Sequence, residues 1–328
     1  MNIDLHFHHM PEFTIDELRK KAQFGEAVED QDGVPYHIIE EMRMRFPIPR
    51  EMYDIEYVLE LMKDQHIDVA AICPTPLLFR NKYDPADVLP IHKKLNDYFA
   101  DLQRQFPDHF APLGTIPMKD QKGALAELER CMEIGLRGIE IETNIDGRNL
   151  DDPEFRPIFE RAAALGATIF MHPIRIIGPE RLRDWYLSNF IGNPTDSTVA
   201  IASLIFSGVI EEYPNIKIVC AHGGGASPAL VGRWDHGWEV RPETKALPKP
   251  PSHYYKMLYF DSLNHSEVIL DHLIDTVGAD HIVLGSDFPY DMGNERVAKD
   301  VEESTRLDDA TKRLILGETA QRLLGIQA

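Results

Sequence analysis

Cysteine is scarce in this chain, and the patterns that depend on it are missing. The 328 residues include three cysteines, Cys73, Cys131 and Cys220, which lie far apart and form no CxxC pair. This spacing provides neither a disulfide framework nor a cysteine-based metal motif. No apolar run reaches the roughly 18 residues of a membrane-spanning helix, and the first residues do not follow a signal-peptide pattern. We therefore expect a reducing, cytoplasmic location.

Positive charge is also in short supply. Lysine and arginine number 34 against 54 aspartates and glutamates, which gives a formal net charge of −20 at pH 7. Such a surface repels nucleic-acid phosphates and anionic lipids, so we expect neither as a partner. An anionic substrate would need local positive charge from arginine or from a metal ion. The phosphate-binding motifs GxGxxG, after the first strand, and GxxxxGK[ST] are absent as well.

Short apolar runs alternate with amphipathic segments along the chain. Runs such as 69–72 and 282–284 are continuously apolar, as strands buried on both faces are. We expect strands at 2–7, 67–73, 111–116, 138–142, 167–172, 217–222, 257–261 and 281–287, with helices between them and after the last. This alternation predicts one α/β domain over residues 1–328, a (β/α)8 TIM-like barrel. An open doubly wound sheet would give the same local signals.

The spacing is broken between the first two predicted strands, which are farther apart than a loop and a helix require. Within this stretch, the β-prone runs 26–29 and 34–38 flank Asp32 and Gly33. An Asp-Gly pair between two such runs indicates a hairpin. We predict that residues 10–52 form a small β-hairpin insertion over the barrel mouth.

Polar side chains close several of the predicted strands. His6 and His8 are two residues apart on the first strand, so both imidazoles point to the same side. His172, His222 and Asp287 each end a later apolar strand. In a barrel, the carboxyl ends of the strands meet at one mouth, where such enzymes hold their active sites. A lone His-x-His pair is often solvated, but this larger group predicts a site for a divalent ion such as Zn²⁺.

Four longer motifs carry a resemblance to a known family. They are Met171-His172-Pro173, Ala-His-Gly-Gly-Gly-Ala at 221–226, Val231-Gly232-Arg233 and Gly-Ser-Asp-Phe-Pro at 285–289. With the strand-end residues, they resemble the non-oxidative decarboxylase branch of the amidohydrolase superfamily along nearly the whole chain. The strand-four lysine of the dinuclear members has no equivalent in segment 138–143. The resemblance therefore implies one divalent ion, Zn²⁺ or alternatively Mn²⁺.

The resemblance also assigns roles to residues. It implies that His6, His8, His172 and Asp287 bind the ion, while His222, together with Asp287, is catalytic and moves a proton. The implied enzyme is a carbon–carbon lyase, a metal-dependent non-oxidative decarboxylase of an aromatic or muconate-type carboxylic acid. The alternative is a metal-dependent hydrolase or hydratase that acts on a ring-cleavage product or a related carboxylate.

Arginine is the expected partner of an anionic substrate, because its guanidinium group matches a carboxylate. By resemblance, Arg233 binds the substrate carboxylate in the neighbouring subunit's site, which implies a homodimer. An ion pair on the helix surface is the alternative for Arg233. A second arginine of the relatives falls at Phe46, where the adjacent Arg45 could replace it, and a pocket tryptophan falls at Asn189. These two departures leave the identity of the substrate open.

Other residues near the expected mouth could complete a substrate pocket. Arg175, Arg50 and Arg80 lie on predicted loops and could supply positive charge, although an isolated loop arginine is usually solvated. Two aromatic residues, Phe288 and Tyr290, follow the aspartate that ends the eighth strand. Each of them either lines the pocket or packs in the core.

Overall fold

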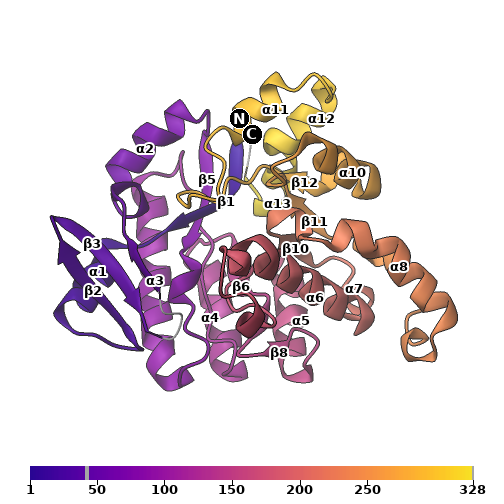
Figure 1. Cartoon of the computed structure of the whole chain (residues 1–328), viewed down its shortest axis with the longest axis horizontal. Coiled ribbons are helices and arrows are strands. Elements are labelled where there is room, and N and C mark those ends of the chain that lie inside the picture. Colours follow the sequence, from indigo (N-terminus) through magenta and orange to yellow (C-terminus); the bar gives the residue numbers. More distant parts are fainter. Residues whose placement is uncertain (41–43, 327–328) are drawn as a thin grey trace.

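The computed structural model describes residues 1–40 and 44–326 and has an α/β fold (Figure 1). Its central strands pair in parallel in two groups, one of two strands and one of five. These strands are β1 (Ile3–His9), β5 (Val69–Pro74), β6 (Gly138–Glu142), β9 (Thr168–His172), β10 (Lys217–Cys220), β11 (Tyr259–Asp261) and β12 (Ile282–Val283). Nearly all of their residues are buried, as in a parallel sheet that is covered on both faces.

The segment 110–114 joins the two groups of strands. The sequence predicts a strand at 111–116, but this segment forms isolated bridges instead, since Pro112 has no backbone N–H to donate. Backbone hydrogen bonds nevertheless link it to both neighbours and link the last strand to the first. They run from Ala111 N to Ala70 O at 2.9 Å, from Leu113 N to Ile72 O at 3.0 Å, from Glu140 N to Gly114 O at 2.8 Å, from Leu5 N to Leu284 O at 2.9 Å and from His8 N to Phe288 O at 2.8 Å. The parallel segments therefore close into a ring in sequence order.

Helices follow the strands and surround the ring (Figure 1). They are α2 (Ile55–Asp64), α3 (Pro85–Gln105), α4 (Gln121–Glu133), α5 (Arg156–Leu165), α6 (Asn193–Phe206), α7 (Val209–Glu212), α8 (Ser227–Val240), α9 (Pro251–Tyr255), α10 (Glu267–Val277), α11 (Val297–Glu303), α12 (Asp309–Arg313) and α13 (Thr319–Leu324). Helix α8 lies between β10 and β11, where a helix was expected, although Gly232 and Gly237 interrupt its apolar spacing. None of the described helices combines the length and apolar character needed to cross a lipid bilayer.

Two hydrophobic layers hold the ring together. The larger layer lies between the strands and the helices and contains Ile72, Ile141 and Ile218. The smaller layer fills the interior with residues such as Leu5 and Phe170, and it includes Leu323 of α13. Because α13 packs at the end where the strands begin, the carboxyl ends of the strands are left to form the opposite mouth.

A β-bulge in β1 turns the first-strand histidines inward. Between Asp4 and Phe7, β1 contains one residue more than the facing part of β5. Leu5 and His6 therefore both face the interior, whereas strict alternation would direct His6 outward. The side chain of Asp4 stabilises the bulge, since its Oδ1 accepts the backbone N–H groups of His6 at 3.0 Å and of Ser286 at 3.1 Å.

The segment 10–52 contains α1 (Glu12–Lys20) and a three-stranded antiparallel sheet of β2 (Glu26–Gln31), β3 (Val34–Ile39) and β4 (Met44–Pro47). Strands β2 and β3 are joined by a turn in which Asp32 and Gly33 both have positive φ. Residues 41–43 of this segment lie outside the described residues. A buried ion pair fastens the sheet to the loop after β5, because Arg80 donates to both carboxylate oxygens of Glu26, at 3.1 and 2.8 Å.

The buried His92 on α3 leads us to predict that the free energy of unfolding falls in acid. Its ring is fully buried, and its Nε2 lies 2.8 Å from the carbonyl oxygen of Phe79. Burial lowers the pKa of His92 from 6.5 to about 4, so the unfolded chain binds a proton in this range that the folded chain does not. The free energy of unfolding should therefore fall as the pH drops from 6.5 toward 4, and it should fall less in His92→Gln, which keeps an N–H donor and does not titrate.

Thermal unfolding measured at a series of pH values from about 8 to about 4 tests this expectation. His272→Gln is the matched control, because His272 is exposed on α10, and its pH dependence should equal that of the wild type. An equal loss of stability on acidification in the wild type and in His92→Gln would show that His92 is not responsible.

Candidate metal centre

Four side chains from three strand ends converge inside the mouth of the ring. His6 and His8 come from β1, His172 ends β9, and Asp287 follows β12. The Nε2 atoms of His6 and His8 are 3.1 Å apart, and they lie 3.1 and 3.2 Å from Asp287 Oδ1. His172 Nε2 is 3.9 Å from the same oxygen. One potential ligand atom of each residue lies within 4.8 Å of the other three, and all four side chains are buried.

This geometry fits a divalent ion. Tetrahedral ligands about 2.1 Å from an ion lie about 3.4 Å from one another, which is close to the observed spacing. Within the described part of the chain, neither ring nitrogen of His172 has a hydrogen-bond partner, and Asp287 Oδ1 has none. Buried polar atoms without partners are strongly unfavourable, and an ion would satisfy them. Three imidazoles and one carboxylate are a donor set that Zn²⁺ and similar ions accept.

The pKa values of the three histidines show which rings offer a lone pair to an ion. Burial lowers the pKa of His8 to about 4 and that of His172 well below its usual value, so both rings are neutral and offer lone pairs. Burial also acts to lower the pKa of His6, but the carboxylates of Asp287 and Asp261 outweigh it and raise that pKa to about 10. His6 therefore carries the positive charge that balances Asp287, and an ion bound at this group would take over that role.

His222 lies beside the group and outside it. Its Nε2 is 3.3 Å from Asp287 Oδ2, the oxygen that the other histidines do not contact, and its side chain is 17% exposed. The residue has a φ of 55°, in the left-handed region, and begins the Gly-rich segment after β10. The segment depends on glycine, because a Cβ on Gly225 would lie 2.0 Å from the carbonyl oxygen of Pro194. The segment thus holds the His222 ring against Asp287 at the edge of the group.

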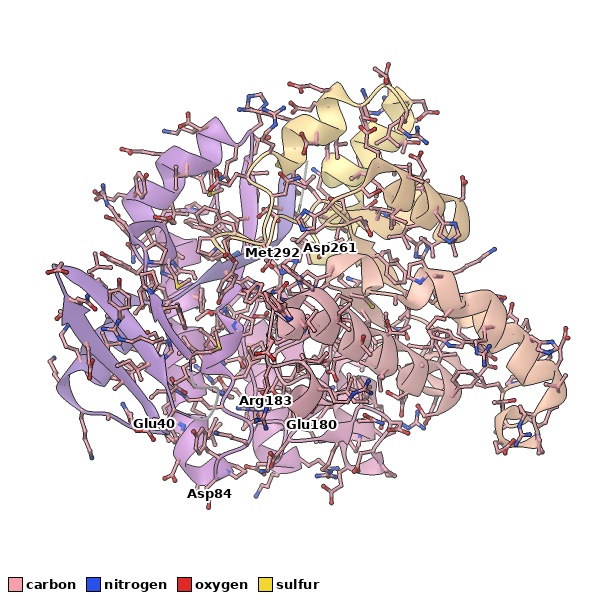
Figure 2. All side chains as sticks on the ribbon, in the orientation of Figure 1. Glu40, Asp84, Glu180, Arg183, Asp261 and Met292 are labelled. Carbon is pink, nitrogen blue, oxygen red and sulfur yellow. The ribbon has the colours of Figure 1, made fainter. Side chains whose placement is uncertain are left out.

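Asp261, at the end of β11, is a site residue that the sequence did not reveal. Figure 2 labels it near the centre of the molecule. Its Oδ2 is 2.6 Å from His6 Nδ1 and also accepts the backbone N–H of His222 at 2.9 Å, while its Oδ1 accepts that of Gly223 at 2.7 Å. A carboxylate behind a ligand histidine fixes the ring and its tautomer. The sequence feature that could have revealed Asp261 was its position at the end of the predicted strand 257–261.

Comparison with known proteins identifies the family. A family model described as amidohydrolase matches residues 3–326. The chain belongs to the amidohydrolase family. Two related proteins are 2-amino-3-carboxymuconate-6-semialdehyde decarboxylases. That of Dictyostelium discoideum is 32% identical over 99% of this chain and 92% of its own, and that of Caenorhabditis elegans is 26% identical over 99% and 94%.

Solved structures share the fold of this amidohydrolase. The 5-carboxyvanillate decarboxylase of Sphingomonas paucimobilis superimposes with a TM-score of 0.86 at 23% identity, over 99% of both chains. A dihydroxybenzoic acid decarboxylase of Polaromonas sp., solved with bound manganese, superimposes with a TM-score of 0.81 at 24% identity, over 100% of this chain and 98% of its own. At these identities the likeness establishes the fold alone.

The two aromatic residues after Asp287 have different places in the amidohydrolase. Tyr290 lies at the site, with its ring edge-on to that of His8 at 5.5 Å and its hydroxyl hydrogen-bonded to Thr75. Phe288 instead stacks on Phe7, with ring centroids 4.4 Å apart, in the core between strands and helices. Phe288 thus packs in the core, which was the alternative considered for it.

Arg45 does not join the metal-binding group. It is exposed on β4, where its guanidinium donates to Gln31 at 2.9 Å and stacks over the ring of Tyr36 at 4.1 Å. Alternation along β4 directs Phe46 to the other face, where its ring lies 5.4 Å from that of the buried His37. The partners of Arg45 thus belong to the exposed face of the insertion.

The other arginines differ in their surroundings. Arg175 lines a narrow cleft between the insertion and the mouth of the ring, with its Nε 3.9 Å from the buried Glu142 carboxylate. Arg50 is exposed and pairs with Asp54 at 2.7 Å. Arg233 is exposed on α8, the helix that projects from the body of the molecule in Figure 1. No described residue pairs with Arg233, so the ion pair considered as its alternative role is not formed within the described chain.

We predict that the protein loses its divalent ion when one ligand side chain is removed. Purified wild-type protein should contain one divalent ion per chain, and His172→Ala should contain little, because a nitrogen donor is missing from the site. A bound ion at a hundredfold excess over its Kd should also raise the free energy of unfolding by about 3 kcal/mol, and a chelator should remove this gain. Elemental analysis and thermal unfolding measure both effects.

His253→Ala is the control, since His253 is exposed on α9, and it should keep the wild-type metal content. Wild-type protein without metal, or His172→Ala with a full complement of metal, would contradict the assignment of this site.

Proposed function

We propose that this amidohydrolase is a metal-dependent non-oxidative decarboxylase of an aromatic or muconate-type carboxylic acid. The observation that carries the proposal is the convergence of three imidazoles and one carboxylate within 4.8 Å of one another, with a further histidine beside them. The names of the related proteins support the reaction class. The closed ring is proposed to be a (β/α)8 barrel whose mouth is covered by the insertion at residues 10–52.

His6, His8, His172 and Asp287 would hold the ion, which we propose to be Zn²⁺. The nitrogen-rich donor set favours Zn²⁺, whereas the manganese in a solved neighbour makes Mn²⁺ the alternative. A divalent ion at this site supplies a Lewis acid that polarises the oxygen groups of a bound carboxylic acid. The closed end of the ring and the buried walls keep bulk water away from the reacting carbon.

The remaining chemistry is proton transfer. When the bond between the substrate carbon and the carboxylate carbon breaks, CO₂ leaves and the electron pair stays on the substrate carbon. A proton must then reach that carbon, and His222 is the imidazole placed to deliver it. Asp287 Oδ2, at 3.3 Å from His222 Nε2, orients the ring. Catalysis would thus use His222 for the proton and Asp287 for its orientation.

The substrate carboxylate requires positive charge from arginine. Arg175 is proposed to supply it from within the subunit, because it lines the cleft beside the mouth. Tyr290 is proposed to line the pocket next to His8. Arg233 is proposed to reach the site of the partner in a homodimer, which its exposure on the projecting α8 supports. The three unpaired, buried cysteines support a cytoplasmic location.

A panel of aromatic and unsaturated dicarboxylic acids, assayed for CO₂ release with the metal-loaded protein, tests the proposed reaction. At least one acid should release CO₂ without net uptake of water, and His222→Ala should retain metal while losing turnover by about two to four orders of magnitude. Entry of ¹⁸O from water into the product would show a hydrolase or hydratase instead. Unchanged turnover in His222→Ala would remove His222 from the mechanism.

Mixing two inactive variants tests the shared site. His222→Ala subunits still provide Arg233, and Arg233→Ala subunits still provide His222, so a mixed dimer has one complete site. Random reassociation of equal amounts should restore about a quarter of the wild-type activity, since half of the dimers are mixed and each has one of two sites. No recovery, in a sample that native mass spectrometry shows to contain mixed dimers, would place Arg233 outside the partner's site.

A further inference from the structure

Glu140 is a buried carboxylate in the aliphatic interior of the ring. On β6, Ile139 and Ile141 face the layer under the helices, so Glu140 faces inward and is 1% exposed. Neither of its carboxylate oxygens has a hydrogen-bond partner among the residues that the structure describes. An isolated carboxylate is strongly unfavourable in such surroundings. We therefore expect a positively polarised group next to the Glu140 carboxylate.

That neighbour is the ring of His8. Glu140 Oε1 lies 3.6 Å from His8 Nδ1, the nitrogen on the far side of the ring from the metal-binding group. The thiol of Cys73 lies 3.4 Å from the same nitrogen. However, sulfur is a weak acceptor, and the thiol also lies 3.3 Å from the carbonyl oxygen of Phe7, to which it can donate. The carboxylate is thus the stronger acceptor available to His8 Nδ1.

What this contact does depends on which ring nitrogen of His8 carries the proton. A neutral imidazole has one N–H, and its other nitrogen is the one that can bind an ion. An ion at the metal-binding group would use the lone pair of His8 Nε2, so the proton of the neutral ring would then lie on Nδ1. His6 also has a carboxylate at this nitrogen, since its Nδ1 lies 2.6 Å from Asp261. Both of the potential ligand histidines of β1 therefore have a carboxylate on the side away from the ion site.

We propose that Glu140 is a positioning residue of the metal centre, which accepts the Nδ1–H of His8 and so presents Nε2 of that ring to the ion. The inference rests on the proposed metal centre and adds a role for a residue that does not touch substrate. A carboxylate in this place fixes the ring orientation and increases the basicity of the ligand nitrogen.

Glu142 provides a matched control on the same strand. It is two residues further along β6, is also 1% exposed and faces the same way. Its partners are different, because it accepts a hydrogen bond from Asn81 at 3.2 Å and lies near Arg175. The two glutamates thus share burial and strand position and differ in their contact with a metal ligand.

Titration of the apoprotein with Zn²⁺ against a competing chelator tests the proposal. Glu140→Gln and Glu140→Leu should each raise the Kd for Zn²⁺ by about tenfold to a hundredfold, whereas Glu142→Gln and Cys73→Ala should leave it unchanged. The metal-free Glu140→Leu protein should unfold at the wild-type temperature or above it, because an apolar side chain suits its surroundings. Metal binding would then be weakened without loss of the fold.

The outcomes separate this proposal from the one it rests on. Wild-type protein that binds no ion overturns the metal centre and this role with it. Tight wild-type binding that Glu140→Gln and Glu140→Leu do not weaken overturns the role of Glu140 alone. Two ions per wild-type chain and one in Glu140→Gln would also overturn it, because His8, Cys73 and Glu140 would then form a second binding site.

Discussion

The structure depends on bringing one lone pair from each of four side chains to the same point. His6, His8, His172 and Asp287 are separated by most of the chain, yet their ligand atoms lie within 4.8 Å of one another. None of the four groups can be placed by local structure alone, because they come from the ends of three strands. The ring must therefore close, and the bonds between the segment after β12 and β1 are what bring Asp287 against the first-strand histidines.

A second set of carboxylates controls those ligands from behind. Asp261 holds His6, Glu140 faces His8, and Asp4 holds the bulge that turns His6 inward. Each of these acids is fully or almost fully buried, which is costly unless a positive charge is close. A dication in the centre would supply that charge. The interior of the ring is thus aliphatic around residues such as Leu5 and Phe170, and it carries buried acids around the first-strand ligand histidines.

The sequence was informative where one residue type at a strand end determines the outcome. Apolar runs predicted most of the central strands, and the polar residues closing them predicted that His6, His8, His172, His222 and Asp287 meet at one mouth. It was not informative where geometry depends on contacts between distant segments. The bulge in β1 arises from pairing with β5, and Asp261 is one acid among many until its neighbours are known. Arg45 faces solvent because β4, a strand that the sequence did not predict, decides which of two adjacent side chains is exposed.

The same reasoning explains why the metal-binding group was easier to predict than a substrate pocket. Ligand positions are set by the strands, whereas the cleft beside the mouth is lined by loops and by the insertion. There, Phe46 contacts His37, which lies 3.2 Å from Glu26, and Glu26 pairs with the buried Arg80. The charge of Arg80 is thus balanced within the chain. These contacts join the insertion to the loop after β5, so they depend on segments far apart in the sequence and could not be predicted from either segment alone.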